Sequence, residues 1–492
     1  MADSNAFVLG ADPAGRPVTQ SLRLANRHGL IAGATGTGKT VTLQRLAESF
    51  SDAGVAVFAA DIKGDLCGLG AAGEPKGAVA ERIAGMPWLD YRACAYPVTL
   101  WDVHGQSGHP LRTTLSEMGP LLLGNLLELT DSQQAALYAA YRVADREGLL
   151  LLDLKDLKAL LNHLRENPQL LGEDSALFTT ASAQALLRRL ATLEQQGAES
   201  LFGEPALQLE DLLRPEPDGR GRVHLLDASR LVHESPKVYA TFLLWLLAEL
   251  FEQLPERGDV DKPLLALFFD EAHLLFADTP RALQERLEQV VRLIRSKGVG
   301  VYFVTQSPGD LPDSILAQLG LRIQHGLRAY TAREQKALRA VADGFRPNPA
   351  FDALSVLTEL GIGEALVGTL EEKGTPAMVQ RVAIAPPQSR IGPLSPAERS
   401  ALVSGSPLLG RYDKPIDRES AYERLTQRAA QATGTDAAGS GEGGGGLADM
   451  AGELLGTLAS RTMKTAMRQA ADQLGRQLVR GLLGSLLGGK RR

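Results

Sequence analysis

Residues 33–40 read GATGTGKT and match the pattern G-x-x-x-x-G-K-[ST] in full. The apolar residues 30–32 before them predict a short strand, and residues 41–50 carry apolar side chains at helical spacing. In this context the backbone N–H groups of a glycine-rich loop surround phosphate groups, and the helix N-terminus favours their negative charge. We therefore predict that ATP binds on a phosphate-binding loop (P-loop) made by Gly33, Ala34, Thr35, Gly36, Thr37, Gly38, Lys39 and Thr40. Lys39 would reach the β- and γ-phosphates, and Thr40 would ligate Mg²⁺.

A second motif indicates hydrolysis as well as binding. The apolar residues 264–269 predict a buried strand, and Asp270 and Glu271 follow it directly. Asp270 at the strand end would support the Mg²⁺ ion together with Thr40, and Glu271 would activate the attacking water. The alternative is a solvated acidic pair. A second carboxylate favours an ATPase over a kinase-type P-loop enzyme, which has no general need for it.

Further polar residues follow other predicted strands. Gln306 comes after the apolar residues 300–305 and would sense the γ-phosphate or the water, although a polar strand end is common. Arg322 and Arg328 flank a late strand, and we predict Arg322 as the arginine that a ring ATPase supplies to the γ-phosphate of its neighbour. His273 is a candidate relay of the nucleotide state, or a packed histidine.

The segment DIKGD at residues 61–65 follows the second predicted strand. Because ligands bind at the carboxyl edge of such sheets, Lys63 or Asp65 could belong to the site. The alternative is a turn held by Asp61 and Gly64.

Composition is that of an ordinary globular protein. The 492 residues are 44% hydrophobic and 22% charged, and the net charge of −6 argues against an extensive basic surface without excluding a local basic channel. Strands and helices alternate, which predicts an α/β fold with a mainly parallel sheet covered on both faces. The predicted organisation is a core in two parts (1–67 and 222–385), a mostly helical insertion (68–221), a helical extension (386–432), a glycine-rich linker (433–446) and a flexible, helical tail (447–492).

The tail differs in charge from the rest of the chain. Residues 447–492 contain eight basic and three acidic residues, a net charge of +5, with leucines gathered on one helical face. Such a helix suits an anionic membrane surface, nucleic acid or a partner helix, or it docks on its own oligomer. The apolar stretch at residues 238–254 is interrupted by Glu249 and Glu252 and is too short for a membrane span. A cytoplasmic protein is therefore expected, with the tail as a point of contact for the inner face of the membrane.

Taken together, the motifs resemble one branch of P-loop ATPases. The set is GATGTGKT at 33–40, DIKGDL at 61–66, FFDEAH at 268–273, VTQSPGDLP at 304–312 and LGLRIQHGLRA at 319–329. Its order is similar to that of the HerA/FtsK branch, and more closely to the bacterial HerA-like family, over residues 5–390 and the tail. The resemblance implies a RecA-like core, hexameric rings with ATP hydrolysis at subunit interfaces, and DNA translocation or helicase activity.

One feature departs from the family pattern. HerA carries a sizeable N-terminal β-barrel and pairs with a nuclease, whereas here the P-loop already begins at Gly33. This departure, the overall acidity and the basic tail support a rival hypothesis, an ATP-gated assembly that acts on protein or membrane partners. A nucleotide-binding scaffold without turnover is a third reading, which the intact Glu271 disfavours.

Overall fold

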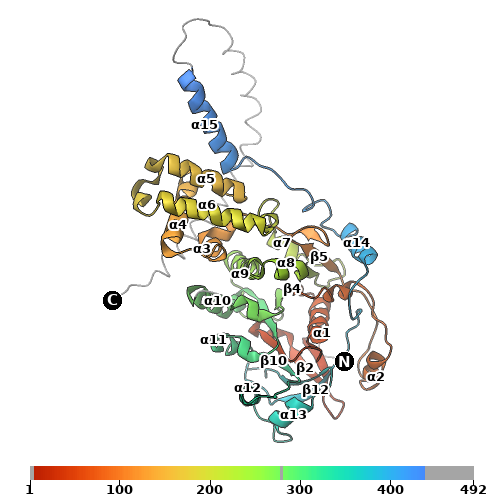
Figure 1. Cartoon of the computed structure of the whole chain (residues 1–492). Helices are drawn as coiled ribbons and strands as arrows, with labels where there is room; N and C mark the ends of the chain where they lie inside the picture. The colour runs from red at the N-terminus through yellow and green to blue at the C-terminus, as the bar shows by residue number, and fades with distance from the viewer. Residues whose placement is uncertain (1–4, 278–280, 438–492) are drawn as a thin grey trace. The chain divides into compact units, whose positions relative to one another are not determined.

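The computed structural model describes residues 5–277 and 281–437, and in this part of the chain twelve strands form one sheet (Figure 1). In spatial order the strands are β2 (Pro17–Ser21), β1 (Ala6–Ala11), β12 (Gln380–Ile384), β11 (Glu364–Gly368), β10 (Leu321–His325), β3 (Gly29–Ala32), β9 (Val299–Thr305), β8 (Leu265–Phe269), β4 (Ala56–Asp61), β7 (Val223–Asp227), β5 (Val98–Asp102) and β6 (His109–Pro110).

Most of the sheet is parallel. Every neighbouring pair from β10 to β6 runs parallel, so the predicted α/β fold with a mainly parallel sheet is confirmed. The pairs from β10 to β2 are antiparallel, and the sequence predicted neither this antiparallel pairing nor strand β12. For two of these four pairs, β1–β2 and β11–β12, the physical reason is connection length. Residues 12–16 and 369–379 join strand pairs directly, and short connections without a crossover helix return the chain antiparallel.

Helices cover both faces of the sheet (Figure 1). Alternate strand residues point to opposite faces, so Ile31 packs on the side of Phe50, while Leu30 belongs to the core on the other side. The helices are α1 (Lys39–Asp52), α2 (Ala78–Ala84), α3 (Leu115–Leu126), α4 (Asp131–Glu147), α5 (Leu154–Glu166), α6 (Thr180–Gln195), α7 (Leu209–Leu213), α8 (Ser229–Glu234), α9 (Pro236–Gln253), α10 (Arg281–Ile294), α11 (Asp313–Leu316), α12 (Ala332–Asp343), α13 (Ala353–Glu359), α14 (Pro396–Ser404) and α15 (Ala421–Ala437). No helix among the described residues is long and apolar enough to span a membrane.

Residues 68–221 do not form a separate unit. They supply helices α2 to α7 and also β5 and β6, and β5 pairs with β7 in the main sheet. Residues 1–426 make one compact unit, and a second unit begins at Gln427. Helix α15 ends at Ala437, inside the predicted linker, and the rest of that linker and the predicted tail lie outside the described residues.

A buried histidine fixes the start of the central strand β3. His28 precedes the strand, its Nε2 lies 2.7 Å from the carbonyl oxygen of Val291, and its Nδ1 accepts the N–H of Val301 at 3.0 Å. The ring is therefore neutral, with the proton on Nε2. Burial lowers the pKa of His28 from 6.5 to about 4.

This pKa shift predicts a loss of stability in acid. Between pH 6.5 and 4 the unfolded chain binds a proton at residue 28 that the folded chain does not bind, so the free energy of unfolding falls as pH falls. From pH 7.5 to 5.5 the expected loss from His28 is about 1 kcal/mol. Urea unfolding at the two pH values should show a correspondingly smaller pH dependence in His28→Gln, and an unchanged dependence would contradict the assignment.

Candidate active site

The predicted site residues follow three adjacent strands of the sheet. Ala32 at the end of β3 is in register with Thr305 at the end of β9, and Phe269 at the end of β8 pairs with Phe303 on β9. The P-loop, Gln306 and Asp270 therefore leave the same carboxyl edge of the sheet side by side. Parallel strands bind ligands at this edge.

The P-loop follows β3, and helix α1 begins at Lys39. Gly36 and Gly38 have φ values of 79° and 112°, which side-chain-bearing residues rarely adopt. The Lys39 ammonium donates to the carbonyl oxygens of Gly33, at 2.6 Å, and Ala34, at 3.1 Å. The lysine is thus folded over its own loop.

Lys39 also lies in the field of three other charges. Burial lowers its pKa and the positive charge of Lys63 lowers it further, whereas Glu271 and Asp270 raise it. The structure therefore brings the predicted P-loop lysine together with both predicted carboxylates.

The two carboxylates sit in different surroundings. Burial raises the pKa of Asp270 to about 6, and the N–H of Glu271 donates to Asp270 Oδ1 at 2.9 Å. Glu271 has a left-handed backbone, with φ of 45°, a strained conformation for a non-glycine residue that is typical of functional sites. Its Oε2 is buried and has no hydrogen-bond partner in the described residues, and His273 Nδ1 lies 3.4 Å away without bonding geometry. A buried carboxylate oxygen left with accepting capacity fits a residue that orients a water.

Both interpretations of the DIKGD segment, a turn held by Asp61 and a contribution to the site, have support in the structure. The Asp61 carboxylate accepts the backbone N–H groups of Gly64, Asp65 and Leu66 at 2.7–3.2 Å, so Asp61 holds a turn. The same turn carries Lys63, whose charge acts on both Lys39 and Asp270. Lys63 therefore lies close enough to influence the site.

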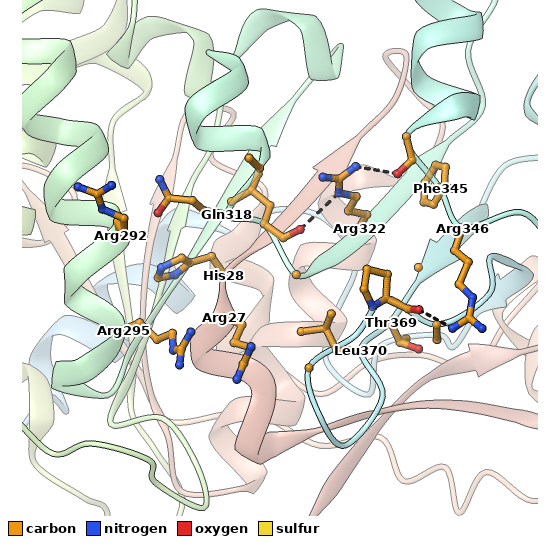
Figure 2. Close-up of a pocket in the computed structure, with 18 residues that line it drawn as sticks. Arg27, His28, Arg292, Arg295, Gln318, Arg322, Phe345, Arg346, Thr369 and Leu370 are labelled. Carbon is orange, nitrogen blue, oxygen red and sulfur yellow. Dashed lines mark hydrogen bonds between the residues drawn. The ribbon is translucent and has the colours of Figure 1, made fainter.

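The other predicted residues are dispersed. Gln306 is exposed at the carboxyl edge beside the P-loop. Arg322 pairs with Leu30, and its guanidinium donates to the carbonyl oxygens of Leu316, Leu319 and Gly344 at 2.9–3.3 Å, in a cavity near the amino end of β3 (Figure 2). The structure does not bring Arg322 to the P-loop of its own chain. The alternative arginine, Arg328, is exposed beyond β10.

Sequence reasoning missed His325, which supports the P-loop from the neighbouring strand. The imidazole is buried, with Nε2 2.9 Å from Thr42 Oγ1 on α1 and Nδ1 2.9 Å from the carbonyl oxygen of Glu364. Burial lowers the pKa of His325 to about 4. Its Cβ lies where a side chain on Gly33 would go. The only signal in the sequence is a histidine at the end of an apolar strand, which specifies no partner.

Comparison with known proteins decides the family. The protein-family model described as helicase HerA-like C-terminal matches residues 7–492. The chain belongs to the HerA-like family. No curated protein sequence matches it.

Solved structures show the same type of fold. The bacterial conjugative coupling protein TrwB is similar over 80% of this HerA-like chain and 91% of its own, with 15% identity and a TM-score of 0.52. VirB4 of Thermoanaerobacter pseudethanolicus covers 81% of this chain and 99% of its own, with 18% identity and a TM-score of 0.50. TrwB was also solved with the non-hydrolysable ATP analogue ADPNP, and that structure has 16% identity, 80% and 91% coverage and a TM-score of 0.51. The predicted family and the RecA-like P-loop ATPase fold are confirmed.

The close contact between Gly33 of the P-loop and His325 of β10 allows a test of the nucleotide site in this HerA-like chain. In Gly33→Ala the added Cβ would lie 2.5 Å from His325 Cβ and 3.0 Å from Thr37 Oγ1, so the loop must move. We expect the affinity for ATP to fall at least about tenfold, which is 1.4 kcal/mol, measured with a fluorescent ATP analogue. Gly15→Ala is the control, because Gly15 also has a positive φ (78°) but its Cβ would meet no atom within 4 Å. Equal affinities of the two variants would contradict the role assigned to the contact.

Proposed function

We propose that this HerA-like chain hydrolyses ATP with Mg²⁺, and that hydrolysis drives a ring-shaped motor acting on DNA. The hydrolytic part of this proposal rests on the buried Oε2 of Glu271, which accepts no hydrogen bond within the described residues. This carboxylate acts electrostatically on the P-loop lysine together with Asp270. A P-loop alone supports binding. The added carboxylate oxygen supplies an acceptor for the attacking water.

Each residue has a distinct role in this proposal. Loop N–H groups and Lys39 hold the phosphates, and Thr40 and Asp270 hold Mg²⁺, which would neutralise charge developing on the phosphoryl oxygens. Glu271 orients the water and accepts its proton. Gln306, exposed beside the loop, senses the γ-phosphate.

Arg322, the arginine proposed to contact the γ-phosphate of a neighbouring subunit, would have to change its contacts to do so. Its guanidinium already donates to three backbone carbonyls, so it would have to release at least one of them to reach a phosphate on a neighbouring subunit. Replacing Arg322 would also leave those carbonyl groups without their donor. Loss of activity in an Arg322 variant would therefore need a matched measurement of stability.

DNA as the cargo and a hexameric ring are supported by the resemblance to the HerA/FtsK branch, and the cytoplasm is proposed as the location of the ring. The matching model is named for a helicase, and TrwB is a conjugative coupling protein. A second candidate function is an ATP-gated assembly on protein or membrane partners, which the net charge of −6 and the basic residues at 447–492 favour.

ATP hydrolysis tests both candidates. We would measure phosphate release by the full chain with no DNA, single-stranded DNA and duplex DNA over a salt series, with Glu271→Gln as the control. Stimulation by duplex that declines steeply with salt supports the motor, because phosphate contacts are salt-dependent. Turnover that depends on Glu271 but ignores DNA at every salt concentration would reject DNA as the activator and favour the second candidate.

A further inference from the structure

The cavity that contains Arg322 lies at the amino edge of the parallel strands, away from the P-loop (Figure 2). Arg27 and His28 come just before β3, whereas Gly33 comes just after it, so the strand itself separates this cavity from the P-loop. At about 3.3 Å per residue, the five steps from His28 to Gly33 span about 16 Å. The cavity has a volume of about 440 Å³, within the range of sites for small molecules.

The lining is strongly basic. Among the described residues, five arginines and no aspartate or glutamate line the cavity. The arginines come from segments far apart in the sequence: Arg27, Arg292, Arg295, Arg322 and Arg346. Figure 2 shows the side chains of Arg27, Arg292 and Arg295 grouped around His28. These arginines come from the end of α10, the segment before β3 and strand β10, among others. Only the tertiary structure brings them together.

Two of these arginines already have structural roles. Arg322 donates to three backbone carbonyls, and Arg346 pairs with Glu371 at 2.8 Å. By contrast, the guanidinium groups of Arg27, Arg292 and Arg295 make no hydrogen bond or ion pair within the described residues. Their donors therefore remain available.

The charges crowd one another. Burial lowers the pKa of Arg27, and the positive charges of Arg295 and Arg23 lower it further, with Asp259 the opposing negative group. Asp259 lines an adjoining hollow together with Arg292 and Arg295. A single carboxylate does not balance three guanidinium groups, so an anion bound between them would relieve repulsion.

We propose that this arginine cavity binds the phosphate groups of a nucleotide or nucleic acid at a site separate from the P-loop. Planar guanidinium groups match phosphate oxygens in a bidentate manner, and phosphate supplies the two or more charges that the unpaired arginines require. Arg27, Arg292 and Arg295 bind the phosphate, while Arg322, held by its carbonyl acceptors, shapes the wall of the cavity.

The test uses pyrophosphate and the full chain carrying Lys39→Ala, which weakens phosphate binding at the P-loop. Isothermal titration compares this protein with the same protein carrying Arg27→Gln and Arg295→Gln. The matched control carries Arg188→Gln and Arg189→Gln, because both arginines are exposed on α6. We expect at least tenfold weaker binding in the Arg27/Arg295 variant and unchanged binding in the control.

Three results would overturn the proposal: no binding of pyrophosphate, unchanged affinity in the Arg27/Arg295 variant, or an equal loss of affinity in this variant and in the control. If the glutamine variant melts at a lower temperature than its parent, Arg27→Lys with Arg295→Lys replaces it. Lysine keeps the positive charge but lacks the bidentate guanidinium group, so an affinity between those of the parent and the glutamine variant is expected. An affinity equal to that of the parent would count against the site.

Competition identifies the source of the phosphate. Displacement of pyrophosphate by AMP in the Lys39→Ala protein assigns the cavity to free nucleotides, and displacement by a short DNA duplex but not by AMP assigns it to a nucleic-acid backbone. Displacement by neither would overturn the proposal. Because the measurement is binding at a second site, it fails or succeeds independently of ATP hydrolysis.

Discussion

Lys39→Ala is expected to reduce ATP hydrolysis at least about 100-fold, the scale on which removal of one preorganised charged donor acts. The ammonium already lies over the loop, on the carbonyl oxygens of Gly33 and Ala34, and a bound phosphate would compete with these acceptors for it. Alanine removes the only side-chain cation of the P-loop itself, in residues 33–40. Phosphate release at saturating ATP and Mg²⁺ measures the effect.

The control for this variant is Lys336→Ala, because Lys336 is an exposed lysine on α12. It should hydrolyse ATP at the parental rate. A melting temperature for each protein separates loss of the ammonium from loss of the fold. Normal hydrolysis by folded Lys39→Ala would reject the assignment of this loop as the catalytic nucleotide site.

Glu271→Gln is expected to lower kcat by about 100-fold or more while ATP binding stays within about twofold, since general-base catalysis typically contributes this much. Glutamine has nearly the same shape and keeps one carbonyl oxygen, but it cannot accept the proton of the attacking water. The buried Oε2 has no hydrogen-bond partner within the described residues, so the substitution leaves no protein donor unsatisfied. A change confined to kcat is therefore the expected signature.

Glu74→Gln is the matched control, because Glu74 is an exposed glutamate whose ion pair with Lys76 lies on the surface. It should leave both kcat and KM unchanged. Binding of a fluorescent ATP analogue to each variant completes the comparison. Retained turnover in Glu271→Gln, or loss of ATP binding equal to the loss of turnover, would contradict the role of a water-activating residue.

The sequence alone determined the local parts of this protein. The P-loop is contiguous, and its glycines, its lysine and the strand and helix around it are specified within about 20 residues, so the pattern predicts the local geometry. The apolar runs before Asp270 and Gln306 similarly predicted the strands after which these residues lie. Periodicity and alternation of these elements also predicted the mainly parallel sheet and the α/β class.

Only the tertiary structure decided which distant residues meet. Strand β3 pairs with β9 and β10, whose residues come more than 260 positions later, and no local pattern specifies such pairings. They place His325 against Gly33, assign Arg322 to the opposite edge from the P-loop, and gather Arg27, Arg292 and Arg295 around one cavity. Short-range steric and hydrogen-bonding preferences shape a loop within its own segment, whereas the neighbours of a strand depend on burying the whole sheet at once.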